Sequence, residues 1–471
     1  MSDDIVFKSA SELASDIRDQ RISARDVMEA FLTKIEQVNP IVNAVCTLDT
    51  QNARAQADTA DQMLLSGKGV GPLHGLPIAI KDLHATAGML TTLGSPIYAD
   101  SIPSHDHLHV ARLRAAGAII IGKTNTPEFG AGSQTFNQVF GVTRNPYRLD
   151  RTPGGSSGGA AAAVASGMLP FADGSDMGGS LRNPAAYCNV LGFRPAPGRI
   201  PTWPTTNSQS RLSVPGPIAR NATDLALFLQ ATAGPDDRVP LSIDEPPSIF
   251  AAPLERAFDG VNVAWSPRLG QYEVDAEVIA VCERALMHFE SIGCEVVRRD
   301  PNFSDADEIF QTLRAQSFAL NYSELYRNHR DALKDTVIWN IEQGQRLSGP
   351  DISRAESLRT QLIAELVGFF EDVEYLLCPT TQVPPFSHDI DWIREINGVE
   401  MQTYIDWMGV CYAITVTGCP ALSFPVGFTE SGLPVGMQLV GRPKRDFAVL
   451  QLAHALEDVC THGQTRPDLT S

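Results

Sequence analysis

The chain carries two glycine-rich serine clusters, GGSSGG at residues 154–159 and GSDMGGSLR at residues 174–182. A serine between glycines suits a nucleophile, because glycine accepts restricted backbone conformations and brings bare N–H groups close to a reacting carbonyl. One such cluster is also typical of an ordinary turn. Two clusters, downstream of Lys81 in the run IAIKD at residues 78–82, form a set of candidate catalytic residues.

Short apolar runs alternate with turns and helical patterns around the two clusters. PIAI at residues 77–80 and AIII at residues 118–121 are typical of buried strands, and the first would deliver Lys81 to its end. The alanine-rich residues 160–165 predict a helix directly behind the first cluster. This alternation predicts an α/β fold in which helices cover a sheet.

Helical patterns also dominate three regions away from the clusters. Residues 1–65 look helical, with Ser23 as the N-cap of a helix that Pro40 is expected to end. Residues 275–292 predict an amphipathic helix. Residues 303–370 are mostly helical and rich in polar side chains.

The bulk composition excludes several classes of protein. The formal net charge of −18 opposes nonspecific binding of nucleic acid, so no nucleic-acid partner is expected. No apolar run reaches the roughly 18 residues of a membrane span, and the N-terminus lacks a signal-peptide pattern. We therefore expect a cytoplasmic protein without membrane contact. The eight cysteines include no C-x-x-C pair, which favours reduced, mostly buried thiols over disulfides or zinc ligands. We expect neither a metal nor a cofactor.

Three literal motif matches are weaker than they look. GAIIIGKT at residues 117–124 fits the phosphate-loop pattern, but its apolar interior is itself the expected strand. The G-x-S-x-G match at residues 154–158 needs a later acid and histidine, and no histidine stands in a recognisable motif. HDHLH at residues 105–109 resembles a metal-binding tract and is interpreted as a solvated loop.

Four motifs taken together resemble the amidase signature family of serine hydrolases. They are GLPIAIKD at 75–82, GKTNTPEF at 122–129, PGGSSGG at 153–159 and GSDMGGSLRNPA at 174–185. The resemblance implies a large mixed β-sheet core covered by helices on both faces. It also implies one amidase domain over residues 1–471, with an N-terminal helical region at 1–65, a signature core at 73–200 and a variable helical specificity region at 300–400.

The family's catalytic order of lysine, serine and serine falls on Lys81, Ser156 and Ser180. The resemblance implies that Ser180 is the nucleophile of an acyl-enzyme and that Ser156, on a cis peptide bond, relays its proton. Lys81 would be the base and must then be neutral, which burial favours by lowering a lysine pKa. Ser157 is an expected N-cap and supporting hydrogen-bond partner.

The second cluster would also supply supporting groups. Backbone N–H groups of Met177, Gly178 and Gly179, with that of the nucleophile, would bind the developing oxyanion. Asp176 and Arg182 are expected to form a supporting ion pair or hydrogen-bond network.

The resemblance implies hydrolysis of a small-molecule amide, with esters, anilides and carbamates also open, and a homodimer as a compatible assembly. The alternative is the glutamine-hydrolysing subunit of a tRNA-dependent amidotransferase. A noncatalytic member used for binding is a further alternative, disfavoured by the intact serines and lysine. Five aromatic residues are expected either to line the pocket or to lie in the core: Tyr187, Trp203, Trp339, Tyr404 and Trp407.

Overall fold

The largest element of the fold is an eight-stranded sheet. The computed structural model describes residues 2–67 and 69–469. The strand order is β10-β9-β11-β15-β14-β7-β8-β6. The first three strands are parallel and the other neighbours antiparallel, so the sheet is mixed. The strands are β6 (Phe171–Asp176), β7 (Leu191–Arg194), β8 (Val214–Ala219), β9 (Asn262–Trp265), β10 (Glu295–Arg298), β11 (Tyr375–Pro379), β14 (Ala421–Phe428) and β15 (Pro434–Gly441).

A smaller sheet presents the lysine to the main sheet. Its order is β1-β3-β2, in which β2 and β3 are parallel and β1 is antiparallel. The strand β2 lies against β6, and the Lys81 N–H donates to Asp173 Oδ1 at 2.6 Å. The end of β2 is thereby fixed beside the strand that leads into the second cluster. The remaining strands are β1 (Val45–Leu48), β2 (Pro77–Lys81), β3 (Ile119–Thr124), β4 (Phe136–Asn137), β5 (Gly141–Val142), β12 (Glu395–Ile396) and β13 (Val399–Glu400).

Helices cover both faces of the main sheet. A Cβ atom on Gly436 of β15 would touch Ala186 of α7, whereas one on Gly441 would touch Val449 of α14. Successive strand residues face opposite sides, so these positions, an odd number of residues apart, put α7 and α14 on opposite faces. The predicted α/β fold with a large, doubly covered mixed sheet is therefore confirmed.

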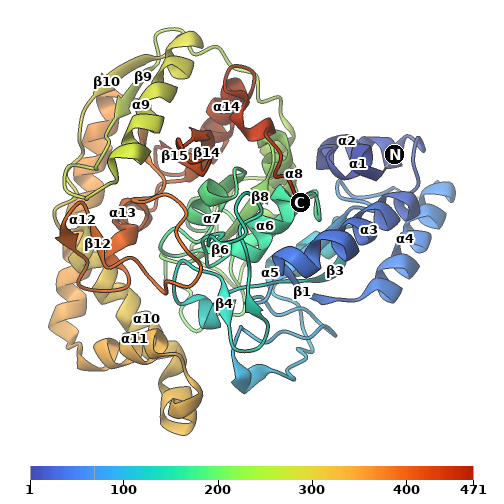
Figure 1. Ribbon diagram of the computed structural model, residues 1–471, viewed down its shortest axis with the longest axis horizontal. Helices are drawn as coiled ribbons and strands as arrows, with labels where there is room; N and C mark the ends of the chain where they lie inside the picture. Colours follow the sequence, from blue (N-terminus) through green and yellow to red (C-terminus); the bar gives the residue numbers. More distant parts are fainter. Residues whose placement is uncertain (1, 68, 470–471) are drawn as a thin grey trace.

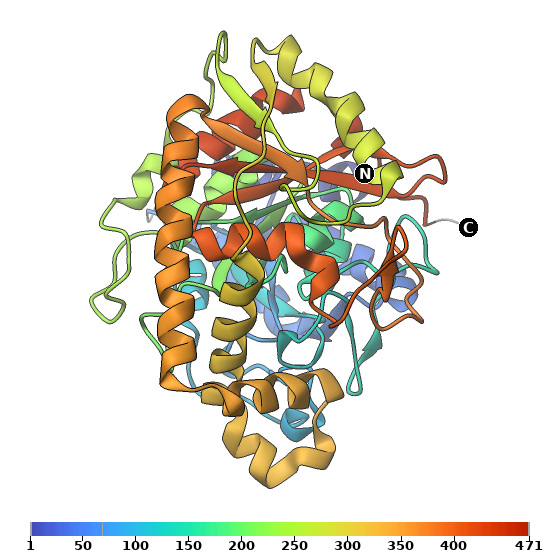
Figure 2. The ribbon, with the colours of Figure 1, turned by 90° about the vertical axis from the view of Figure 1, so that its left-hand side faces the viewer.

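The outer helices form two groups at opposite sides of the molecule. Figure 1 shows α3 and α4 on one side and α10, α11 and α12 on the other. The helix α10 packs against α11 and α12, and Figure 2 shows α12 as a long helix standing beside them. The helices are α1 (Ser2–Val6), α2 (Ala10–Arg18), α3 (Ala24–Val42), α4 (Thr50–Leu65), α5 (Leu108–Ala115), α6 (Gly158–Ala165), α7 (Arg182–Tyr187), α8 (Ala222–Thr232), α9 (Ala276–Ser291), α10 (Ala306–His329), α11 (Asp335–Arg346), α12 (Gly349–Asp372), α13 (Gly409–Thr417) and α14 (Asp446–Glu457).

The apolar core extends between these layers. One continuous cluster of buried side chains includes Val6 near the N-terminus and Cys460 near the C-terminus. A second, smaller cluster joins Phe129 to Phe318 and Val337 of the outer helices. This second cluster matters for function, because it borders the site described below.

The N-terminal region differs from the prediction in two ways. Ser23 caps α3 as expected, but Pro40 lies inside that helix, which continues to Val42 and ends at Asn43 in the left-handed conformation. A proline so close to the C-terminal end removes only one helical hydrogen bond, so the last turn survives. Residues 45–48 form β1 rather than helix, because they pair with β3.

Two predictions drawn from composition can be compared directly with the structure. None of the helices within residues 2–67 and 69–469 combines the length and apolarity that crossing a bilayer requires. All eight cysteines are free, and all but Cys46 are buried, so the expectation of mostly buried thiols is confirmed.

Candidate active site

Lys81 joins the two serine clusters. It is the last residue of β2, and its side chain is fully buried. Its Nζ atom lies 2.8 Å from Ser156 Oγ, 2.7 Å from Ser157 Oγ and 3.2 Å from Ser175 Oγ. Sequence reasoning misses Ser175, although its place in the second cluster is a signal. The fold thus brings one amine and three hydroxyls together from three separate segments.

The environment of Lys81 favours its neutral form. Burial lowers the pKa of Lys81 to about 7, because removal from water disfavours the charged ammonium. The negative charges of Asp173 and Asp176 oppose this shift without cancelling it. A neutral amine is therefore available near neutral pH.

Ser156 occupies a tightly packed turn beside Lys81. The Gly155–Ser156 peptide bond is cis, as the resemblance implies. A Cβ atom on Gly155 would lie 2.9 Å from the backbone of Gln134, so only glycine fits at that position. The Ser133 hydroxyl donates to the Gly155 carbonyl at 2.8 Å. These contacts hold the Ser156 hydroxyl against the lysine. Ser157 occupies the N-cap position of α6, but its hydroxyl oxygen accepts from Lys81 Nζ and does not cap the helix.

Ser180 lies in the loop between β6 and α7, and its hydroxyl bonds to no residue that the structure describes. Across the described chain, the backbone N–H groups of Met177, Gly178 and Ser180 also find no acceptor. Gly179 differs, because its N–H donates to Asp176 Oδ1 at 2.9 Å. Three of the four predicted N–H donors are therefore free, and the fourth shapes the loop.

A buried ion pair supports this loop. Asp176 accepts from Arg182 Nε at 3.0 Å and from Arg182 Nη2 at 2.9 Å, and both side chains are fully buried. Burial would raise the pKa of Asp176, but the charges of Arg182 and Arg194 lower it far below its usual range. The expected Asp176–Arg182 interaction is confirmed, and Arg194 joins it from β7.

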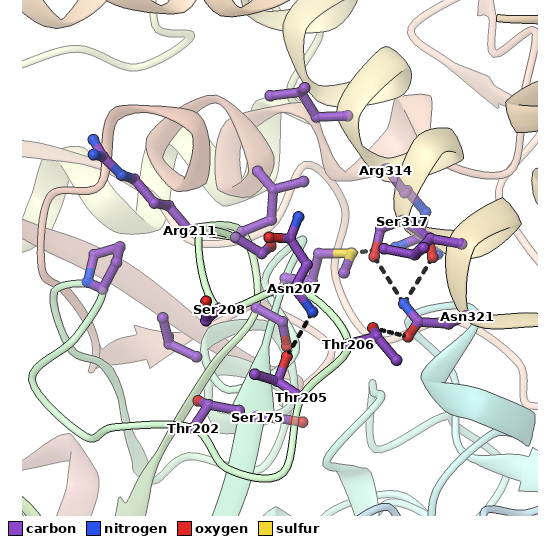
Figure 3. A pocket seen from close by; sticks show the side chains of 18 of the residues that line it. Ser175, Thr202, Thr205, Thr206, Asn207, Ser208, Arg211, Arg314, Ser317 and Asn321 are labelled. Carbon is purple, nitrogen blue, oxygen red and sulfur yellow. Dashed lines mark hydrogen bonds between the residues drawn. The ribbon is translucent and has the colours of Figure 1, made fainter. Parts of the chain in front are cut away.

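A cavity of about 680 Å³ opens onto both serines. Its floor includes Ser156, Ser175 and Ser180. One wall is the loop at residues 202–215 and the other is formed by α10 with part of α12. Figure 3 shows the two walls meeting where Thr206 of the loop donates to Asn321 of α10 at 2.5 Å. A concave cavity of this size, with polar and apolar groups in its lining, is typical of a substrate site for a small molecule.

Known proteins share this arrangement along nearly the whole chain. A sequence model of the family described as Amidase matches residues 26–450. The acylamidase of Rhodococcus erythropolis is 36% identical over 462 residues, which cover 98% of this chain and 97% of that protein. The chain belongs to the amidase signature family.

Two further comparisons bear on activity. The crystal structure of a bacterial aryl acylamidase of the same family superposes with a TM-score of 0.90 at 32% identity, covering 97% of each chain. A glutamyl-tRNA(Gln) amidotransferase subunit of Moorella thermoacetica is 34% identical over an alignment of 492 positions that covers 99% of each chain. With the family match, the acylamidases show that this chain is an amidase, a hydrolase that acts on carbon–nitrogen bonds.

The aromatic residues that line the amidase pocket differ from the five candidates of the sequence analysis. Phe129, Phe318 and Tyr322 line the cavity, with ring centroids 4.7 Å apart for Phe129 and Tyr322 and 5.4 Å apart for Phe318 and Tyr322. None of the five aromatics considered from sequence is among the described residues that line this cavity. Tyr187, Tyr404 and Trp407 are buried in the core instead.

The end of the histidine tract of the amidase is buried. His109 is the second residue of α5 and is fully buried, and its Nε2 donates to Asp173 Oδ2 at 3.0 Å. His84 Nδ1 donates to the same oxygen at 2.6 Å, and His107 Nδ1 lies 2.7 Å from His109 Nδ1. Burial lowers the pKa of His84 to about 4, so this imidazole is neutral near pH 7. The prediction of a solvated loop holds for His105, which is exposed, and fails for His109, because Asp173 supplies a buried acceptor from a distant strand.

The phosphate-loop match also has a structural explanation. Its residues Ile119–Thr124 form β3, and Lys123 is fully buried there. Lys123 Nζ donates to the His84 carbonyl at 2.6 Å and to Thr86 Oγ1 at 2.9 Å. The lysine therefore supports the loop after β2 rather than facing a phosphate.

Proposed function

We propose that this amidase hydrolyses carboxylic amides through a covalent acyl-enzyme on Ser180, with Ser156 and Lys81 completing the catalytic triad. Ser180 Oγ attacks the carbonyl carbon while Ser156 accepts its proton. Ser156 then passes a proton to the leaving nitrogen, and Lys81 serves as the base behind it. Water repeats the sequence in reverse to release the acid. The observation that carries the proposal is the 2.8 Å contact between a buried Lys81 amine and Ser156.

The free N–H groups fit the charge that this reaction develops. Attack places negative charge on the carbonyl oxygen, and the unpaired N–H groups of Met177, Gly178 and Ser180 lie in the loop that carries the nucleophile. Fixed donors of this kind each lower the barrier by about 3 kcal/mol in hydrolases. Asp176 supports the geometry by holding Gly179 and Arg182 on its two oxygens.

The preferred substrate is an acyl amide with an aromatic or apolar group. The cluster of Phe129, Phe318 and Tyr322 offers ring faces on one side of the cavity. The similarity to an acylamidase and to an aryl acylamidase supports the same class. An acyl anilide combines both features and is the substrate of choice for assays.

A fluorophosphonate probe tests the proposal. Intact-mass spectrometry should show one adduct, and peptide mapping should place it on Ser180. Ser180→Ala should lose the adduct and lower kcat on an acyl anilide by a factor on the order of 10⁴ or more. Ser208→Ala is the matched control, because Ser208 lines the same cavity away from Lys81. This variant should keep both the adduct on Ser180 and the kcat of the parent protein. An adduct on another residue would refute the assignment.

Activity assays on acyl anilides and on glutamine distinguish the proposed amidase from the amidotransferase alternative. A glutamine-hydrolysing subunit should release ammonia from glutamine and ignore acyl anilides. We expect the reverse order of kcat/KM for this chain. A higher kcat/KM for glutamine would replace the proposed substrate class while leaving the role of Ser180 intact.

A further inference from the structure

Two groups of metal-ligating side chains occur among the described residues, and their bonding differs. In the first, His84, His109 and Asp173 have ligating atoms within 4.8 Å of one another. Those atoms are already engaged, because both imidazoles donate to Asp173 Oδ2. Hydrogen bonding alone accounts for this first group.

The second group has no such explanation. His288 of α9, Cys460 and His462 also have ligating atoms within 4.8 Å of one another. Cys460 follows α14, and His462 lies in the short helix η6 (Thr461–Gln464). Neither imidazole ring hydrogen-bonds to any residue that the structure describes. The Cys460 thiol makes only a 3.5 Å contact with the Pro425 carbonyl.

The two imidazole rings of this group lie side by side. The ring centroids of His288 and His462 are 6.4 Å apart. The two rings and the Cys460 thiol supply nitrogen and sulfur, which are ligand atoms that zinc prefers.

We propose that His288, Cys460 and His462 bind a divalent ion of the zinc class, with water as the fourth ligand. Tetrahedral zinc places its ligand atoms about 3.5 Å apart, so separations of up to 4.8 Å need to contract by at most about 1.3 Å. The ion would link α9 to the C-terminal segment. Cys460 also borders a separate cavity of about 590 Å³, which gives an entry path.

Binding at this site releases a proton. Burial raises the pKa of the Cys460 thiol to about 11, so the thiol is protonated in the metal-free protein at pH 7. The metal–sulfur bond forms as the S–H bond breaks, and the proton goes to solvent. Both imidazoles bind as neutral ligands.

Cobalt is the most informative probe, because thiolate ligation gives Co²⁺ a near-ultraviolet charge-transfer band. Titrating chelator-treated protein with Co²⁺ should develop this band to one equivalent, and Zn²⁺ should displace it. Cys460→Ser should abolish the band, whereas Cys419→Ser, at another buried cysteine, should keep it. No band, or a band that survives Cys460→Ser, overturns the proposal.

A second variant controls for misfolding, because Cys460→Ser changes a buried residue. His462 is exposed, so His462→Ala should fold normally and weaken Zn²⁺ binding at least about tenfold. Zn²⁺ at 100 times its Kd should lower the unfolding equilibrium constant of the parent protein about 100-fold. Unchanged affinity in His462→Ala would contradict the proposed ligand set.

Discussion

At the residue scale, the pKa of Lys81 sets the pH range in which the amidase can work. Below its pKa of about 7 the amine carries a proton and cannot accept another. The kcat/KM for an acyl anilide should therefore rise about tenfold per pH unit below 7 and level off above about pH 8. Lys81→Ala should lose both the activity and this ascending limb. Near-normal turnover in Lys81→Ala would require a different base.

The charge of Asp173 should also affect the ascending limb of the pH profile through the pKa of Lys81. It holds the Lys81 N–H, and its negative charge favours the ammonium form of the lysine. Asp173→Asn removes that charge, so the pKa of Lys81 should fall and the limb should move to lower pH by about one unit. Asp82→Asn is the matched control, because Asp82 is buried and next to Lys81 in the chain but accepts from the Thr92 hydroxyl and lies in the field of Lys123. An ascending limb of the kcat/KM profile that stays at the same pH or moves to higher pH would exclude this role for Asp173.

Sequence motifs predict part of this site well. The serines around Lys81 stand in two glycine-rich clusters that the sequence displays, although their meeting at the lysine depends on the fold. Asp173 carries no such signal, since it lies three residues before Asp176 and outside every motif quoted. Its partners His84 and His109 are buried only because two strands and a helix meet there. Proximity of that kind depends on topology rather than on local pattern.

At the element scale, α10 and the loop at residues 202–215 build the substrate pocket. Phe318→Ala should raise KM for an acyl anilide about tenfold with little change in kcat, because it removes ground-state contact with the substrate. Phe369→Ala on α12 removes an equally buried ring that does not line the cavity. Both variants should lose roughly 3–5 kcal/mol of stability, and only the first should change KM. Equal KM effects would show that stability alone is being measured.

The helical part of this pocket was predictable and the loop was not. Residues 303–370 show helical periodicity, and α10, α11 and α12 confirm it. The loop sequence PTTNSQSRL at residues 204–212 has neither apolar periodicity nor a catalytic motif. Its position over the serines follows from the strands on either side, β7 and β8, which are adjacent in the main sheet.

At the scale of the whole molecule, carboxylates of other helices accept hydrogen bonds from the first N–H groups of α2 and α3. These bonds connect the N-terminal helices to the rest of the protein. Asp224 of α8 accepts from the N–H groups of Ala10 at 2.8 Å and Ser11 at 2.9 Å, at the start of α2. These N–H groups have no partner within their own helix. Asp61 does the same for Ala24 and Arg25 of α3.

Removing one of these caps should loosen the N-terminal layer. Asp224→Ala leaves two buried N–H groups unpaired and should cost about 1–3 kcal/mol of unfolding free energy in urea titrations. Asp244→Ala, at an exposed position, should change it by less than about 0.5 kcal/mol. Limited proteolysis should cut Asp224→Ala first within residues 2–20. Unaltered stability would mean that the cap is replaced by water.

The hydroxyls around Lys81 also have a directional consequence. An ammonium offers three N–H donors, whereas an amine offers two and a lone pair. Three serine hydroxyls surround Nζ, so all can accept from the charged form, but one must turn and donate to the neutral form. If that hydroxyl is Ser156, its own lone pairs are left facing Ser180. Rotation of the Ser156 O–H bond then separates two states of the site. In one state the hydroxyl accepts from charged Lys81, and in the other it donates to neutral Lys81 and can accept the proton of Ser180.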